Sequence, residues 1–189
     1  MKNINKMLGV MLVSSTLGLT ACQNMSMNND HEPRHAMLPH QKLTDGQVIK
    51  VLSTANNGEI MQAQAALPKL QSAQVRNYAQ MMINEHSMNE QKGQALANRL
   101  NLMPQASDTS NGLQRDSDNI VNNLARSTTA VDRDYMMSQV KVHRKVLKTI
   151  DDQLLPNAAN PELKSMLAQT RNAVAMHLQT AEQLVSMMK

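Results

Sequence analysis

The feature that most constrains the fold is a run of apolar side chains that recur every three or four residues between about residues 72 and 100. Such a period places them on one face of a long helix, and a helix of this kind buries that face against a core. His86 falls inside the face, and Asn89 is its one plainly polar interruption. The stretch therefore predicts a long helix with one imidazole on its core-facing side. The apolar positions are Val75, Tyr78, Ala79, Met82, Gly93, Leu96 and Leu100.

Three more stretches share this period and complete a bundle. Helices are predicted over about 44–66, 130–155 and 160–189, with a shorter and more polar helix over about 112–125. Leu67-Pro68 breaks the first helix, and Asn160-Pro161-Glu162 places a capping residue, a proline and an acid at the start of the last. Alternating β-branched runs and hairpin turns are missing. The sequence predicts an all-α fold, a four-helix bundle over 43–189 with an additional short helix.

The first 21 residues have the pattern of an export signal. Lys2 and Lys6 precede an apolar run over 7–19 that is too short to span a membrane. The closing Leu19-Thr20-Ala21-Cys22 resembles a bacterial lipobox, which implies cleavage before Cys22 and its lipidation, with palmitate among the acyl chains. Cys22 is the only cysteine, so it cannot form an internal disulfide. We predict a lipoprotein signal peptide at 1–21; the alternative is an ordinary secretory signal with an incidental cysteine.

Residues 22–42 are predicted to form a disordered tether between the lipid and the bundle, because they are polar and have no period. Gln23 stands where an aspartate would resemble an inner-membrane retention signal, so we expect an outer-membrane lipoprotein that faces the periplasm. The tether is either a solvated spacer or also a copper-capturing arm, because thioethers and imidazoles suit copper. Its candidate copper ligands are Met25, Met27, His31, His35, Met37 and His40.

Charge and aromatic content argue against a nucleic-acid partner. The formal net charge is +4, and loss of Lys2 and Lys6 with the signal peptide lowers it to +2. The chain has two tyrosines and no phenylalanine or tryptophan, so it lacks platforms for base stacking. The core must consist of Leu, Val, Ala, Tyr and Met, and we interpret most of the 17 methionines as flexible core residues.

Each long helix carries one acid or imidazole inside its apolar face. One such inward residue from each of four helices is how helical bundles build metal sites, and imidazole with carboxylate suits zinc, copper, iron or manganese. Glu90 is placed to pair with His86, whereas Glu85 is expected to point to a different side. The predicted ligands are Glu59, His86, His143 and His177, and the predicted supporting residues are Asp132, Tyr135, Gln139 and Glu90.

Two observations weigh against this site. No glutamate lies three residues before a bundle histidine, so the Glu-x-x-His pattern of di-iron bundle proteins is not present. Counting from the predicted turns also staggers the ligands of paired helices by roughly 6–10 Å at 1.5 Å per residue. The alternative is that each histidine is a neutral core residue, hydrogen-bonded to a nearby Tyr, Gln or Asp.

Several short blocks occur in an order typical of one family: Asn57-Gly58-Glu59-Ile60, Val75-x-x-Tyr78-Ala79-x-x-Met82-x-x-Glu85-His86, Val131-Asp132-Arg133-Asp134-Tyr135, His143 and His177-Leu178. Over about 44–189 the chain resembles bacterial exported proteins with a ferritin-like bundle, a domain-of-unknown-function family often labelled predicted outer membrane protein. The chain departs from the family pattern where it has Glu85, Val131 and Ala173-Val174 in place of Asp, Phe and Leu-Pro. The resemblance implies a ferritin-like fold but no reaction. The residues that match its motif positions are Glu59, His86, Asp132, Tyr135, His143 and His177.

Three functions remain open from the sequence. The first is an envelope lipoprotein that binds or buffers a transition metal. The second is a structural or stress-related lipoprotein whose bundle binds an envelope protein. The third, which we rank last, is a metal-dependent enzyme with Tyr135 or Asp132 as proton-transfer group. The sequence shows no nucleophile with a paired base and no phosphate-binding glycine loop, which disfavours other enzyme classes.

Overall fold

The structure is a computed structural model that describes residues 42–188. The predicted signal peptide at 1–21, the lipidation site at Cys22 and the copper-binding positions of the tether lie outside these residues. Within 42–188 no helix combines the length and the apolar character that crossing a membrane requires.

Five long helices make up the described part of the chain: α1 (Asp45–Ala66), α2 (Ala73–Arg99), α3 (Asp108–Arg126), α4 (Val131–Thr149) and α6 (Pro161–Met187). A 3₁₀ turn, η1 (Leu67–Lys69), follows α1 at the predicted break. The π-helical turn η2 (Ile150–Leu154) and the short α5 (Leu155–Asn157) extend α4. No strand occurs between residues 42 and 188. The prediction of an all-α fold is confirmed.

Local side-chain chemistry explains where the helices begin and end. The Thr44 hydroxyl accepts from the Gln47 N–H, and the Gln47 side chain accepts from the Thr44 N–H, which together cap α1. Asn160 caps α6 by accepting from the N–H groups of Glu162 and Leu163. α2 ends where Asn101 adopts a left-handed conformation with φ of 52°. These features match the start and stop signals of the sequence.

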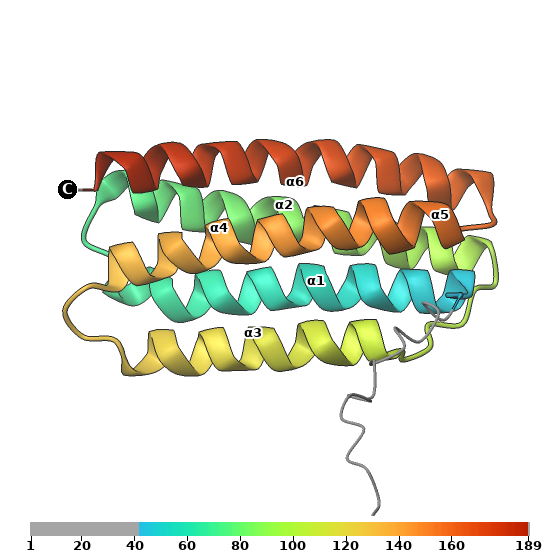
Figure 1. Ribbon diagram of the computed structural model, residues 1–189, viewed down its shortest axis with the longest axis horizontal. Helices are drawn as coiled ribbons and strands as arrows, with labels where there is room; N and C mark the ends of the chain where they lie inside the picture. Colours follow the sequence, from blue (N-terminus) through green and yellow to red (C-terminus); the bar gives the residue numbers. More distant parts are fainter. Residues whose placement is uncertain (1–41, 189) are drawn as a thin grey trace, which may run out of the picture. The chain divides into compact units, whose positions relative to one another are not determined.

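The additional helix, α3, is longer than predicted. It begins at Asp108 and not near residue 112, because Ser107 and Ser110 cap each other reciprocally at its N-terminus. The prediction of a short helix here was therefore wrong in length. α3 packs along α1 on the outside of the bundle (Figure 1).

The other four long helices form an antiparallel bundle in the spatial order α1, α2, α6, α4 (Figure 1). The closest packing is within two hairpins, α1 with α2 and α4 with α6, whereas α1 contacts α4 and α2 contacts α6 over fewer residues. A wider seam therefore separates the two hairpins. The functional side chains described below lie in this seam.

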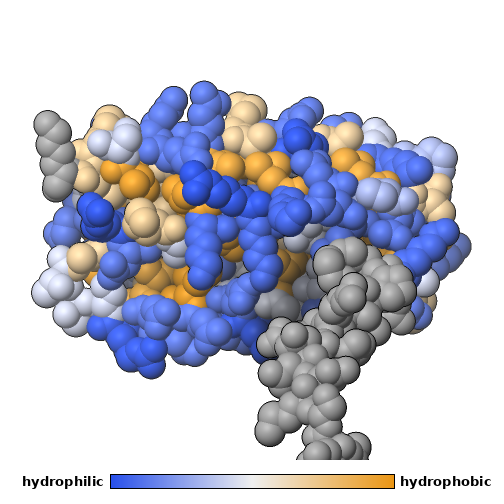
Figure 2. All heavy atoms as spheres, viewed as in Figure 1, coloured by the Kyte–Doolittle hydropathy of each residue, from blue (hydrophilic) through white to orange (hydrophobic). Residues whose placement is uncertain are grey.

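The core consists of two apolar clusters, one toward each end of the bundle. One cluster includes Val48, Leu52, Ile150 and Leu163, and the other includes the two tyrosines and Met82. Between them each helix contributes polar residues to the buried layer. Figure 2 shows a mainly polar outer face, with apolar side chains in the seams between helices. The buried polar members of the middle layer are Asn56, Glu59, Gln62, His86, Glu90, Gln139, His143 and His177.

Candidate metal centre

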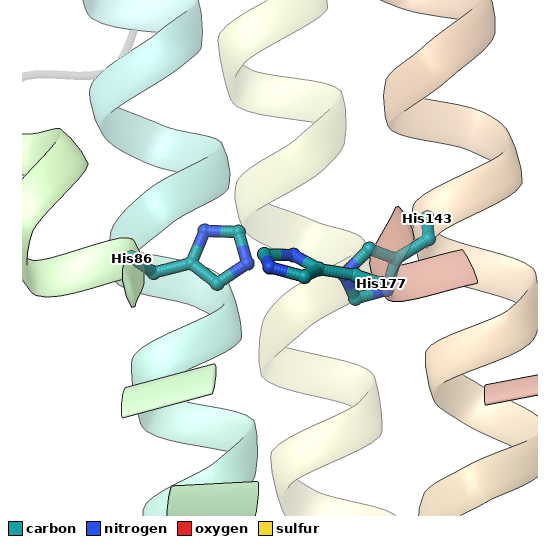
Figure 3. A group of neighbouring side chains, drawn as sticks. All are labelled: His86, His143 and His177. Carbon is teal, nitrogen blue, oxygen red and sulfur yellow. The ribbon is translucent and has the colours of Figure 1, made fainter. Parts of the chain in front are cut away.

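Three histidines from three helices meet in the middle of the bundle (Figure 3). His86 comes from α2, His143 from α4 and His177 from α6. One ring nitrogen of each lies within 4.8 Å of those of the other two. The ring centroids are 5.2 to 5.9 Å apart, and all three side chains are buried. The structure therefore brings together three of the four predicted ligands.

The predicted stagger between His143 and His177 is too large. α5 carries the helix on to Asn157, so His143 lies 14 residues before the turn, while His177 lies 16 residues after Pro161. A difference of two residues corresponds to about 3 Å along the axis. The two rings are thus nearly level, because the turn between the helices is shorter than the sequence indicates.

Each histidine donates one ring N–H to a fixed acceptor. His86 Nδ1 is 3.1 Å from Asn56 Oδ1, and His143 Nδ1 is 2.9 Å from the Gln139 carbonyl oxygen. His177 Nε2 is 2.7 Å from Glu85 Oε2. Because carbonyl and carboxylate oxygens only accept, the bonded nitrogen of each ring carries the proton. The other nitrogen of each ring has a lone pair and no hydrogen-bond partner among residues 42–188: His86 Nε2, His143 Nε2 and His177 Nδ1.

Burial keeps these imidazoles neutral. It lowers the pKa of His86 well below its ordinary value, and the neighbouring His143 and His177 lower it further. Burial and His177 lower the pKa of His143 to about 3, against a smaller opposing effect of the Gln139 carbonyl. Neutral imidazole is the form that binds a metal. The centre is therefore held in its ligand form at neutral pH.

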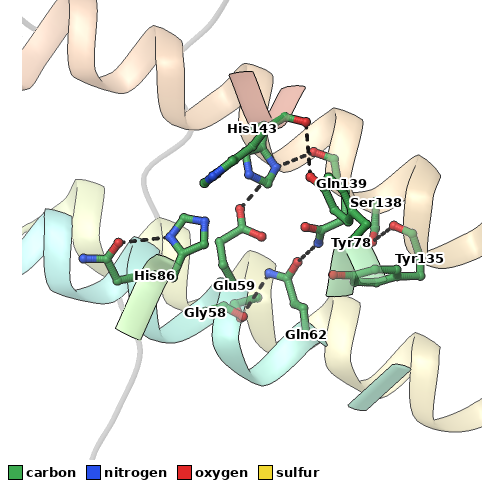
Figure 4. Close-up of polar contacts among 12 residues, drawn as sticks. Gly58, Glu59, Gln62, Tyr78, His86, Tyr135, Ser138, Gln139 and His143 are labelled. Carbon is green, nitrogen blue, oxygen red and sulfur yellow. Dashed lines mark hydrogen bonds and ion pairs between the residues drawn. The ribbon is translucent and has the colours of Figure 1, made fainter. Parts of the chain in front are cut away.

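Glu59, the fourth predicted ligand, lies beside the three histidines and outside their group. Its Oε1 is 3.6 Å from His143 Nδ1, the protonated nitrogen, while the mutually close donor atoms belong to the histidines alone (Figure 4). The stagger explains this, because Glu59 lies seven residues before the end of α1 and His86 lies 13 after the start of α2. Burial raises the pKa of the Glu59 carboxyl to about 8, partly offset by the Gln139 amide.

Two of the predicted supporting residues adjoin the histidines and Glu59. Gln139 orients His143 through its backbone carbonyl, while its side-chain amide donates to Gln62 Oε1 at 3.0 Å. Gln62 in turn donates to the Ser117 hydroxyl of α3 (Figure 4 draws part of this network). Tyr135 is fully buried next to Tyr78, and the negative charge of Glu59 raises its pKa in addition to burial.

The other two supporting residues do not contact the histidines. Asp132 accepts from the backbone N–H groups of Gln71 and Ser72 at the start of α2, three helical turns from His143. Its shared helical face with His143 does not overcome that axial distance. Glu90 accepts from Ser53, Asn56 and Gln94, so it acts on His86 only through Asn56. The direct pairing of Glu90 with His86 was a wrong prediction.

Sequence reasoning missed two residues that orient ligands. Glu85 was expected to point elsewhere, yet it reaches across the seam from α2 to His177 on α6. Its position next to His86 was the only signal. Asn56 lies three residues before Glu59, and its side-chain oxygen accepts from both His86 and Asn89. A buried asparagine one turn from a candidate ligand was the signal that would have found it.

The bundle and the three-histidine group define a class of protein: an all-helical domain with a candidate transition-metal centre in its core. Comparison with protein families then places the chain. It belongs to the family described as Domain of unknown function (DUF4142), whose sequence model matches residues 30–184. The resemblance to a domain-of-unknown-function family is thereby confirmed. Neither the curated proteins nor the solved structures include a match to the chain.

Proposed function

We propose that this protein binds a transition-metal ion through His86, His143 and His177, and that it does so as a lipoprotein of the bacterial envelope, anchored at Cys22. One observation carries the proposal. Three buried, neutral imidazoles direct an unpartnered nitrogen lone pair into one small region, each from a different helix. The envelope location rests on the signal and lipobox pattern of residues 1–22.

The hydrogen bonding of the rings supports ligands over core residues. Buried polar atoms in proteins are nearly always hydrogen-bonded, and a core histidine would be satisfied on both nitrogens or face apolar atoms with one. Here the three unsatisfied nitrogens come together, which costs desolvation energy unless a cation joins them. Metal-binding histidines characteristically donate their second N–H to a carbonyl or carboxylate, as all three do here.

The donor set narrows the metal. Three imidazoles and no carboxylate in the group favour zinc or copper over manganese, which prefers oxygen ligands. Glu85 and Glu59 lie next to ring nitrogens and supply negative charge near the ion without ligating it. The protein would therefore bind the metal with its own imidazoles and use these carboxyl groups to orient them.

Metal analysis tests the proposal. In the full chain, His31, His35 and His40 are replaced with Ala, so that the only remaining histidines are the three of the bundle. We expect about one equivalent of zinc or copper after loading and dialysis, and its loss in His86→Ala, His143→Ala and His177→Ala. Tyr78→Phe, which removes only a bond to the His177 carbonyl oxygen, is the control that keeps the metal. A protein that folds but binds no metal would refute the proposal and favour a bundle that binds an envelope protein.

A further inference from the structure

A pocket of about 180 Å³ lies between α2 and α6 and reaches the three-histidine group from one side. His86 and His177 line it, whereas the fully buried His143 does not. It occupies the seam between the two hairpins, where α2 and α6 pack less closely than the helices within each hairpin. Its remaining walls are formed by Glu85, Met88, Asn89, Lys92, Met166, Gln169, Thr170, Ala173 and Val174.

Small and polar side chains keep this pocket open. Ala173 contributes only a methyl group to its wall, one helical turn before His177. Thr170 donates its hydroxyl to Asn89 Oδ1 at 3.0 Å, a bond that joins α6 to α2 across the seam. The pocket is well above the roughly 10–15 Å³ that one water molecule needs. It can therefore hold a ligand of a few atoms but not a large substrate.

The protein supplies three donor atoms to the centre and no fourth. Among residues 42–188 the group of mutually close ligand atoms consists of His86, His143 and His177 only. Structural zinc sites are closed by four protein ligands, whereas sites with three keep a position for an outside ligand. Such a position matters only if an outside molecule can reach it, and the pocket ends at two of the three ligands.

We propose that the metal ion held by His86, His143 and His177 binds a small outside ligand, reached through the pocket between α2 and α6. This inference rests on the proposed metal binding and deepens it. The ligand class is a lone-pair donor of up to about three heavy atoms, such as azide or hydrogen peroxide, because the pocket admits no more beside the rings. The site is then open and reactive, unlike a closed structural site.

Azide binding to the cobalt-loaded protein tests the inference. The full chain with His31, His35 and His40 replaced by Ala is loaded with Co²⁺, whose visible spectrum reports its ligands. We expect azide to change that spectrum with saturation. Ala173→Leu fills the pocket and should weaken azide binding at least tenfold, with Ala173→Val intermediate, while cobalt stoichiometry stays the same. Ala168→Leu, the same change at an exposed position of α6 outside the pocket, should leave azide binding unchanged.

The outcomes separate this inference from the metal binding beneath it. Stoichiometric cobalt whose spectrum ignores azide overturns the inference and leaves the metal site standing. Azide that binds all four proteins equally shows another route to the metal and also overturns it. Failure to bind cobalt with the helical circular dichroism intact overturns both. Because Ala173→Val adds only two methyl groups, a folding failure of Ala173→Leu still leaves a graded test.

Discussion

At the scale of single residues, the buried ionisable groups act on stability in opposite directions. The lowered pKa values of His86 and His143 mean that the unfolded chain binds more protons below about pH 6.5, so stability rises with pH up to that point. The raised pKa of Glu59, from 4.5 to about 8, means that the folded protein holds a proton that the unfolded chain releases. That contribution is lost as pH rises through 8. Between about pH 6.5 and 8 the effect of Glu59 remains after those of His86 and His143 have ended.

Glu59→Gln should therefore remove an alkaline loss of stability. For the metal-free parent we expect the free energy of unfolding to fall by about 2 kcal/mol between pH 6.5 and 8, since one proton corresponds to about 1.4 kcal/mol per pH unit. The variant should show a flat profile over that range and the same decline in acid. Urea titrations with a chelator present measure this. The control is Glu182→Gln, at an exposed residue paired with Arg144; an unchanged alkaline decline in Glu59→Gln would contradict the assignment.

Glu85 should set the metal affinity through His177. Its carboxylate holds the His177 Nε2–H, which directs Nδ1 toward the other two rings. Loss of such an orienting partner typically costs 10–100-fold in metal affinity. We expect a loss of about that size in Glu85→Ala and a smaller one in Glu85→Gln, whose amide oxygen still accepts. Competition with a coloured chelator measures the affinity, and equal affinities in parent and Glu85→Ala would exclude this role.

At the scale of elements, the first turn of α1 is held against the chain that follows α2. A Cβ at Gly46 would lie 2.2 Å from the Met103 carbonyl oxygen, and Gln105 donates its N–H to the Gly46 carbonyl oxygen at 3.1 Å. Because both contacts involve backbone, no side chain can move aside. Gly46→Ala should cost about 1–3 kcal/mol of unfolding free energy.

A matched substitution controls for helix propensity. At Gly112 in α3 a Cβ would meet nothing closer than an Arg115 nitrogen at 3.9 Å. Gly112→Ala should stabilise the protein by about 0.5–1 kcal/mol, because alanine is the better helix residue. Denaturant midpoints of the two variants measure the contrast. Equal shifts would mean that the close approach at Gly46 does not exist in solution.

The elements also show what a sequence can and cannot predict. The helical period and the caps at Thr44 and Asn160 predict the helices, because both depend on residues a few positions apart. The period also predicts that His86, His143 and His177 face inward. It does not contain the width of the seam or the axial offset between helices, which depend on packing. For that reason Glu85 was assigned to the wrong neighbour and Glu59 was placed among the ligands.

At the scale of the whole molecule, Cys22 should determine where the protein resides. Acyl chains anchor a protein at about 0.8 kcal/mol per buried methylene. In bacteria we expect the parent in the outer-membrane fraction, labelled by a palmitate analogue, and Cys22→Ser unlabelled and released from the membrane. Ser26→Ala, a nearby change without a thiol, should behave like the parent. Cys22→Ser that stays in the membrane fraction would contradict anchoring by lipid, since no helix within 42–188 can span a membrane.

A metal ion at the centre should join the two hairpins of the bundle. His86 belongs to the α1–α2 hairpin, while His143 and His177 belong to the α4–α6 hairpin, so a shared ion links helices that otherwise meet across the wider seam. Binding to the folded state alone stabilises it by about 2.7 kcal/mol at a hundred times the dissociation constant. We expect zinc or copper to raise the unfolding midpoint of the parent and a chelator to reverse the rise. We also expect hydrogen exchange to slow in both hairpins together.

The variant that isolates this link is His86→Ala. It removes the only ligand from the α1–α2 hairpin, so the two histidines left on the other hairpin can no longer bridge the seam. We expect metal to leave the unfolding midpoint of this variant nearly unchanged, while Tyr78→Phe, which keeps all three imidazoles, responds like the parent. A metal-dependent rise of equal size in His86→Ala would place the ion elsewhere. Slower exchange confined to α4 and α6 in the parent would mean that His86 does not ligate it.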